Sequence, residues 1–158
     1  MPVYRSALIA LDREDEAGSE LMGARCRALA IDGEMAIHLV HVRTPLPRSY
    51  LAQMPKNWDL NDQSGAKRWL RDYAAHHEIS TSLAGVHAPS GSIAREVVKL
   101  ARSLEAEVIC VTAHRLDLGR LLLGTNTHAI VRDAPCDVIV VRQSRDQKRH
   151  RLTGNRAP

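Results

Sequence analysis

Residues that could bind an anion gather between a short apolar run and the start of a helical stretch. The run at 108–111 indicates a buried strand. A polar loop with His114 and Arg115 follows it, and Gly124-Thr125 then stands where a helix opens. A helix start presents backbone N–H groups and the positive end of the helix dipole, and both favour a phosphate. The segment therefore predicts a site for the phosphates of a nucleotide.

Each polar residue of this segment also has a simpler interpretation. Thr125 could cap its helix, which is compatible with phosphate binding because both use the same helix end. His114 could form a hydrogen bond within the loop, and Arg115 could be a surface charge, although its place in the loop favours an anion. Asp117 is interpreted as a residue that fixes the loop.

Strand and helix patterns alternate along the chain that must position this site. Apolar runs predict strands at 3–11, 35–42, 79–87, 108–112 and 137–142, of which 79–87 should be an edge strand. Apolar residues at helical spacing predict four helices: Ala17, Leu21, Ala24, Ala28 and Ile31; Ala66, Trp69, Leu70, Tyr73 and Ala74; Ile93, Val97, Leu100, Ala101 and Leu104; Leu123, Thr127, Ile130, Val131 and Ala134.

This alternation predicts an α/β fold with one open, doubly wound, five-stranded sheet. The sheet should be mainly parallel and Rossmann-like, with strand order 3-2-1-4-5. Ligands of such sheets bind at the carboxyl ends of the strands, where the strand order reverses. That crevice would lie between Asp12, after the first strand, and the loop at 112–115. Asp12 could instead cap the first helix.

Composition limits the partners of the chain. Its 158 residues suffice for one domain, expected at 1–143. Residues 144–158 are expected to form a disordered basic tail. Only 3% of the residues are aromatic, so a stacking platform for nucleic acid is not expected. The apolar run at 7–11 is too short for a membrane span. Cys26, Cys110 and Cys136 lack metal-ligand spacing and indicate free thiols in the cytoplasm.

Other polar or aromatic groups are interpreted as structural. His38 and His41 should lie on opposite faces of one strand. His76 and His77 lack an identifiable third metal ligand in the sequence. Residues 43–65 form a long irregular excursion, a kind of segment that often serves as a lid or partner surface. Its Tyr50, Met54 and Trp58 could cover a ligand, but packing over the sheet is favoured.

The sequence contains no recognisable catalytic set. It has no nucleophile with a base and an acid, no Gly-x4-Gly-Lys-Ser/Thr phosphate loop and no Gly-x-Gly-x2-Gly dehydrogenase motif. An enzymatic role is therefore not required by the residues. Slow ATP hydrolysis or autophosphorylation on a hydroxyl is the only turnover considered.

Two stretches resemble the universal stress protein family. The first is Ala113-His-Arg-Leu-Asp-Leu-Gly-Arg-Leu-Leu-Leu-Gly-Thr-Asn-Thr127, and the second is Val131-Arg-Asp-Ala-Pro-Cys-Asp-Val-Ile-Val-Val-Arg142. ATP-binding members carry Gly-x2-Gly-x9-Gly-Ser/Thr before a helix. This chain keeps the last pair and the final strand, but its loop is one residue shorter. Thr112 or Ala113 replaces the first glycine, and Arg115 replaces the second. The loop is similar to a branch with Ser-His-Arg-x-Asp-x7-Gly-Ser-Asn.

The resemblance implies a stress-response regulator that binds ATP or another adenine nucleotide, with or without Mg²⁺. Asp12 would contact the ribose, the backbone of Val42 would contact adenine, and Gly124, Thr125 and Asn126 would hold the phosphates. The full set of expected binding residues is Asp12, Val42, Thr112, Ala113, His114, Arg115, Gly124, Thr125 and Asn126.

The resemblance also implies a homodimer paired through the fifth strand, at Val138, Ile139, Val140 and Val141. An unknown protein partner is expected as well. The altered glycines motivate an alternative, a dimeric interaction module of the same fold that binds no nucleotide.

Overall fold

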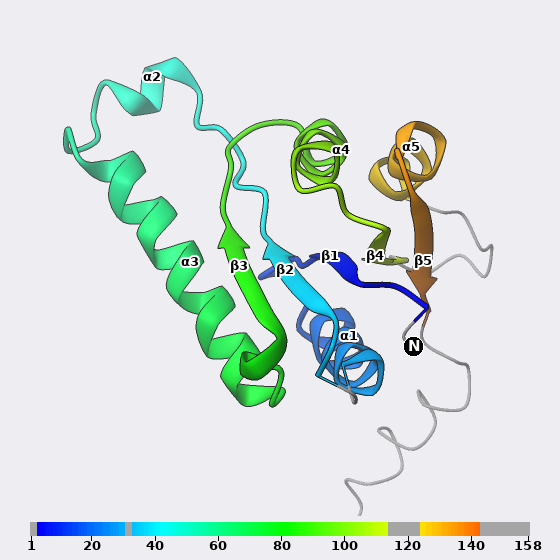
Figure 1. Cartoon of the computed structure of the whole chain (residues 1–158). Coiled ribbons are helices and arrows are strands. Elements are labelled where there is room, and N and C mark those ends of the chain that lie inside the picture. Colours follow the sequence, from blue (N-terminus) through cyan, green and yellow to red (C-terminus); the bar gives the residue numbers. More distant parts are fainter. Residues whose placement is uncertain (1–2, 31–32, 114–123, 143–158) are drawn as a thin grey trace, which may run out of the picture.

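The computed structural model describes residues 3–30, 33–113 and 124–142. Its core is a five-stranded sheet in the order β3-β2-β1-β4-β5, and every neighbouring pair is parallel (Figure 1). The strands are β1 (Ser6–Ala10), β2 (Ala36–Val40), β3 (Leu83–His87), β4 (Val108–Thr112) and β5 (Asp137–Val141). The predicted fold class and strand order are confirmed, and β3 is an edge strand as expected.

Helices cover both faces of this sheet (Figure 1). On one face lie α1 (Glu16–Leu29) and α3 (Trp58–His76), which bury Met22, Cys26 and Leu70 against the strands. On the other face lie α4 (Ile93–Ser103) and α5 (Thr125–Asp133), which bury Val97 and Ile130. Because both faces are covered, the central strands are mostly apolar, and four of the five residues of β4 are buried.

The buried face of α1 differs from the predicted one. Its buried residues are Gly18, Ser19, Met22, Gly23 and Cys26. The predicted Ala24 and Ala28 are exposed. The predicted apolar face is displaced from the buried one, which consists of Met22 and Cys26 together with three small residues, Gly18, Ser19 and Gly23. Small residues allow a close approach of α3, since the hydroxyl of Tyr73 donates to the carbonyl oxygen of Ser19 at 2.6 Å.

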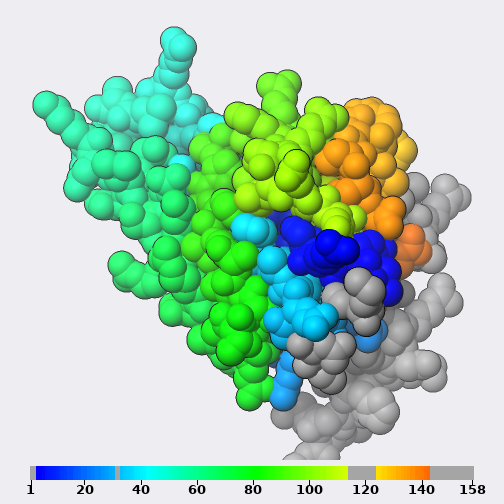
Figure 2. All heavy atoms as spheres, in the orientation of Figure 1, coloured from blue at the N-terminus to red at the C-terminus, as the bar shows by residue number. Residues whose placement is uncertain are grey.

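The excursion at 43–65 is more ordered than predicted. It holds the short helix α2 (Arg48–Leu51), and α3 already begins at Trp58. Tyr50 and Met54 are 58% and 37% exposed, so the prediction that they pack over the sheet is wrong. The four-residue spacing of Tyr50, Met54 and Trp58 does not place them on one helix face, because α2 ends at Leu51 and α3 begins at Trp58. Figure 2 shows the segment around α2, in cyan, projecting from one edge of the molecule.

The cysteines carry no disulfide, as predicted. Cys26 and Cys110 are buried, and Cys136 is partly buried. Burial, with a smaller contribution from Cys136, raises the pKa of the Cys110 thiol to about 12, so this thiol stays protonated and unreactive. None of the described helices is long and apolar enough to cross a membrane.

Candidate functional site

A cavity of about 720 Å³ opens at the carboxyl ends of β1, β2 and β4. The predicted residues Asp12, Val42, Thr112 and Asn126 line it. Here β1 leads to a helix on one face of the sheet and β4 leads to a helix on the other, so the strand order reverses at this point. The volume is typical of pockets for small ligands.

Asp12 lies two residues beyond the end of β1 and is half-buried at the wall of the cavity. One of its carboxylate oxygens accepts a hydrogen bond from the backbone N–H of Glu14 at 3.0 Å. The cap of α1 is a different residue, Asp15, whose Oδ1 accepts from the N–H of Gly18 at 2.9 Å. The interpretation of Asp12 as the helix cap is therefore wrong. Its carboxylate belongs to the turn that forms the cavity wall.

The start of α5 lies beside the end of β4. Asn126 and Thr112 line the cavity, and the hydroxyl of Thr127 donates to the carbonyl oxygen of Thr112 at 3.4 Å. Gly124 occupies the cap position of α5 without a side-chain hydrogen bond, and Thr125 is the first helical residue. The capping role considered for Thr125 is therefore wrong. The N–H groups of this first turn have no acceptor within the helix.

The other predicted binding residues lie at the end of β4, at the start of α5, or outside the described residues. Ala113 is half-buried, and its N–H donates to the carbonyl oxygen of Val141 at 3.0 Å, which continues the pairing of β4 with β5. Ala113, Gly124 and Thr125 are not among the described residues that line the cavity. His114 and Arg115 lie outside the described residues.

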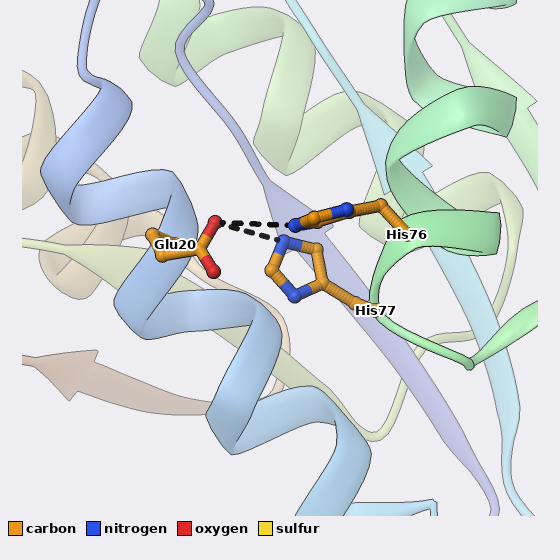
Figure 3. A group of neighbouring side chains, drawn as sticks. All are labelled: Glu20, His76 and His77. Atoms are coloured by element: carbon orange, nitrogen blue, oxygen red, sulfur yellow. Dashed lines mark ion pairs between the residues drawn. The ribbon is translucent and has the colours of Figure 1, made fainter.

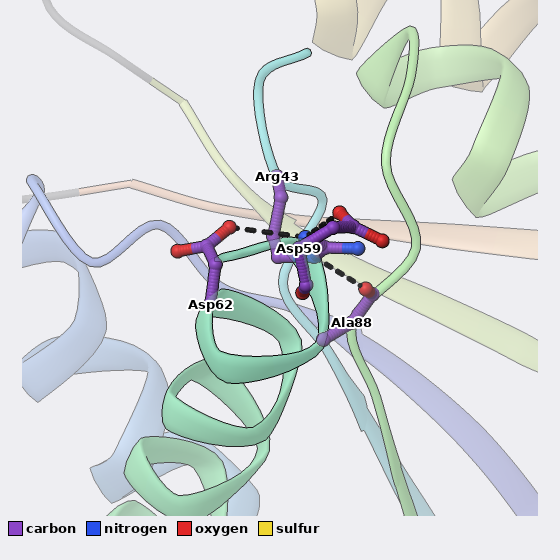
Figure 4. Close-up of polar contacts among 4 residues, drawn as sticks. All are labelled: Arg43, Asp59, Asp62 and Ala88. Carbon is purple, nitrogen blue, oxygen red and sulfur yellow. Dashed lines mark hydrogen bonds and ion pairs between the residues drawn. The ribbon is translucent and has the colours of Figure 1, made fainter. Parts of the chain in front are cut away.

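Sequence reasoning missed Arg43, which is 7% exposed and lines the cavity (Figure 4). Its Nε donates to the carbonyl oxygen of Ala88 at 2.8 Å. One terminal nitrogen donates to carboxylate oxygens of Asp59 at 2.7 Å and Asp62 at 3.0 Å. Burial lowers the pKa of Arg43, but the hydrogen bonds and charges of the two carboxylates raise it more, so its net shift is upward. The sequence signal that could have identified Arg43 is its position directly after the apolar run at 35–42.

This arginine ties three segments together at the rim of the cavity. The backbone N–H of Arg43 donates to the carbonyl oxygen of Pro89 at 2.8 Å, and the carbonyl oxygen of Arg43 accepts from the N–H of Gly91 at 3.1 Å. The pairing of β2 with β3 is thereby continued toward α4. The carboxylates of Asp59 and Asp62 belong to the first turns of α3. The arrangement holds the start of α3 at the cavity, which Trp58 and Asp62 both line.

A cation also lies at the wall of the cavity, at Arg13. Its guanidinium carbon lies 5.9 Å from the centre of the Trp69 ring, a cation–π distance. His41 contacts the same ring edge-on at 5.7 Å. His38, which lies within β2, instead has its Nδ1 atom 3.1 Å from Nε2 of His87. The two histidines thus have separate surroundings, as the strand alternation predicts.

Solved structures share this fold. A crystal structure of a universal stress protein in complex with cAMP is 19% identical, with a TM-score of 0.59, and the match covers 89% of this chain and 98% of that one. Universal stress protein UspA from Lactobacillus plantarum is 18% identical with a TM-score of 0.68, and 88% of this chain and 98% of that one are covered. At these identities the likeness concerns the fold.

Curated relatives match over most of their length. Universal stress protein G of Shigella flexneri is 27% identical over 143 residues, which cover 89% of this chain and all of the relative. Universal stress protein G of Salmonella typhimurium is 30% identical over 112 residues, 67% of this chain and 77% of the relative. The model of the universal stress protein family matches residues 4–142. The chain therefore belongs to the universal stress protein family.

Proposed function

We propose that this protein is a stress-response regulator that binds an adenine nucleotide, with ATP as the favoured ligand, in the cavity between β1 and β4. The observation that carries the proposal is that Asp12, Val42, Thr112 and Asn126, from four separate segments, line one cavity at the reversal of strand order. The related protein in complex with cAMP supports it, because cAMP contains the adenine, ribose and phosphate groups that this cavity would receive.

Each group of the ligand has a suitable place in the cavity. The carboxylate of Asp12 can accept hydrogen bonds from ribose hydroxyls. Adenine would lie near the backbone of Val42, where Ile93 and Val97 add apolar walls. The phosphates would lie at the start of α5, with Gly124, Thr125 and Asn126, because the helix end favours negative charge.

Charge at the cavity favours a phosphate contact by cations other than Arg43. Arg43 is already paired with Asp59 and Asp62. Among the described lining residues, Arg13 is the remaining arginine or lysine. From the sequence, His114 and Arg115 are proposed as further phosphate ligands. Mg²⁺ could accompany the phosphates, because it commonly binds through substrate phosphates and one or two carboxylates, and Asp12 and Glu14 line the cavity.

Replacing Asp12 with asparagine is expected to weaken ATP binding at least about tenfold. The change removes a charge-assisted hydrogen bond worth roughly 1.5–3 kcal/mol, and about 1.4 kcal/mol corresponds to a factor of ten in Kd. Asparagine keeps an oxygen that can accept from Glu14. Isothermal titration calorimetry of both proteins with ATP measures the effect. Asp72→Asn is the matched control because Asp72 is an exposed residue of α3.

Measurements on the wild-type protein distinguish nucleotide binding from an interaction module that binds no nucleotide. ATP at about 100 times its Kd should stabilise the native state by about 2.7 kcal/mol, which thermal unfolding detects. A flat isotherm together with an unchanged Tm would reject nucleotide binding. The protein would then be treated as an interaction module of the same fold, and the replaced glycines at 112–115 would be the reason. Release of ADP or labelling of the protein in the same samples would report slow turnover.

The proposal includes a homodimer through β5 in the cytoplasm. In the described chain β5 is an edge strand that pairs with β4, and Val138, Ile139 and Val140 are only partly buried. A second copy would cover this apolar edge, which otherwise invites unspecific pairing. Unpaired thiols at all three cysteines are consistent with a reducing compartment. The basic tail at 144–158 lies outside the described residues.

A further inference from the structure

Two histidines at the end of α3 converge with a glutamate of α1 (Figure 3). The Nε2 atoms of His76 and His77 lie 3.7 Å and 3.5 Å from the same carboxylate oxygen of Glu20. The three potential ligand atoms all lie within 4.8 Å of one another. The sequence could not identify this third group because Glu20 lies 56 positions before His76.

Two of the three distances between ligand atoms are close to those of a tetrahedral metal site. Zinc binds imidazole nitrogen at about 2.0–2.1 Å and carboxylate oxygen at about 2.0–2.2 Å, so neighbouring ligand atoms of a tetrahedron lie roughly 3.3 Å apart. The two glutamate–histidine distances exceed this value by only a few tenths of an ångström. The imidazole nitrogens of His76 and His77 lie within 4.8 Å of each other, and rotation of the exposed side chains of Glu20 and His76 could bring the three ligand atoms together around one ion.

The third ligand, His77, is held in place by packing. Only 9% of its surface is exposed, and its ring lies 4.3 Å from the ring of Tyr73. The ring occupies the space over Gly23, where a Cβ atom would overlap with it. Tyr73 is itself fixed by its hydrogen bond to the carbonyl oxygen of Ser19. Because the His77 ring is already oriented, metal binding would cost less conformational entropy at this side chain.

The ligand chemistry favours a transition metal over Mg²⁺ or Ca²⁺. Two imidazoles with one carboxylate suit zinc and its neighbours, whereas Mg²⁺ and Ca²⁺ prefer oxygen ligands.

We propose that Glu20, His76 and His77 form a binding site for a divalent transition metal ion such as Zn²⁺, with water as the fourth ligand. The exposure of Glu20 and His76 leaves that fourth position accessible to water. The metal would join α1 to the end of α3, so its effect would be on stability. None of the three residues lines the cavity, so this proposal is independent of nucleotide binding.

The test titrates Zn²⁺ into the full chain after treatment with a chelator. Wild-type protein should bind one equivalent, and Zn²⁺ should raise its Tm because binding stabilises the native state. Glu20→Gln and His76→Ala should each weaken binding by more than the roughly 10- to 100-fold that is lost when a residue that only orients a metal ligand is removed. These exposed positions are chosen because replacement of the packed His77 could disturb folding. With Co²⁺, a strong visible absorption would report tetrahedral coordination.

Matched controls separate this site from unspecific binding. His128 and Glu78 are exposed and are not ligands, so His128→Ala and Glu78→Gln should bind Zn²⁺ like wild type. His114→Ala and His150→Ala should also leave binding unchanged. The proposal is overturned if the wild type binds no Zn²⁺ or if Glu20→Gln and His76→Ala bind Zn²⁺ like wild type. It is also overturned if any control variant weakens Zn²⁺ binding as much as these two do. ATP binding should be the same in Glu20→Gln and wild type.

Discussion

Replacing Arg43 with alanine is expected to lower the free energy of unfolding by about 3 kcal/mol. The guanidinium is buried, and its Nε donates to the carbonyl oxygen of Ala88, a residue that is 2% exposed. Alanine leaves that carbonyl without its partner, which costs about 1–3 kcal/mol. Loss of the packed aliphatic stem adds to the cost. Urea unfolding followed by circular dichroism measures the change.

The carboxylates at Arg43 contribute less than the buried contacts. Asp59 is 66% exposed and Asp62 is 32% exposed, so water can solvate them when the arginine is removed. Exposed ion pairs are worth at most about 1 kcal/mol. For this reason the expected loss lies at the lower end of the range for breaking a buried ion pair.

Two further variants separate charge from geometry. Arg43→Lys keeps a positive charge, but an ammonium cannot reproduce the separate hydrogen bonds to Ala88 and to α3, so a loss of about 1–2 kcal/mol is expected. Arg48→Ala removes an exposed arginine of α2 and should change stability by less than about 0.5 kcal/mol. If Arg43→Ala resembles Arg48→Ala, the role assigned to Arg43 is wrong.

Arg43 also shows why the site was only partly predictable. The strands follow from apolar runs, and Asp12 was found because it directly follows the first of them. Arg43 follows the second strand in the same way, but its partners lie 16, 19 and 45 residues away. Local sequence patterns describe burial along one element. They do not reveal polar contacts among three elements.

The inward face of α1 illustrates a second limit. Hydrophobic periodicity scores apolar side chains, so it gives no weight to Gly18, Ser19 and Gly23. The stripe that it selected through Leu21 and the alanines also misses the buried Met22 and Cys26. The requirement for small residues comes from the partner helix, because Tyr73 and His77 need room against α1. That requirement is visible only when both helices are placed. The sequence singled out His76 and His77, but it did not identify Glu20 as a third ligand, because Glu20 becomes their neighbour only when both helices are placed.

Replacing Gly23 with alanine tests this close approach directly. Alanine normally stabilises a helix interior by up to about 1 kcal/mol relative to glycine. At position 23, however, the new Cβ would overlap with ring atoms of the buried His77. Such overpacking typically costs about 1–3 kcal/mol. We expect a net loss of about 1–2 kcal/mol, measured by urea unfolding, because His77 must leave its place against Tyr73.

Gly65→Ala is the matched control because Gly65 also lies inside a long helix, α3, and has no atom within 4 Å of the new Cβ. Its substitution should stabilise the protein by about 0.5–1 kcal/mol, so the two changes should have opposite signs. In the double variant Gly23→Ala/His77→Ala the obstacle is gone, and the combined loss should be smaller than the sum of the single losses. If Gly23→Ala stabilises the protein as Gly65→Ala does, His77 is not held against α1. Its preorganisation as a metal ligand would then also be refuted.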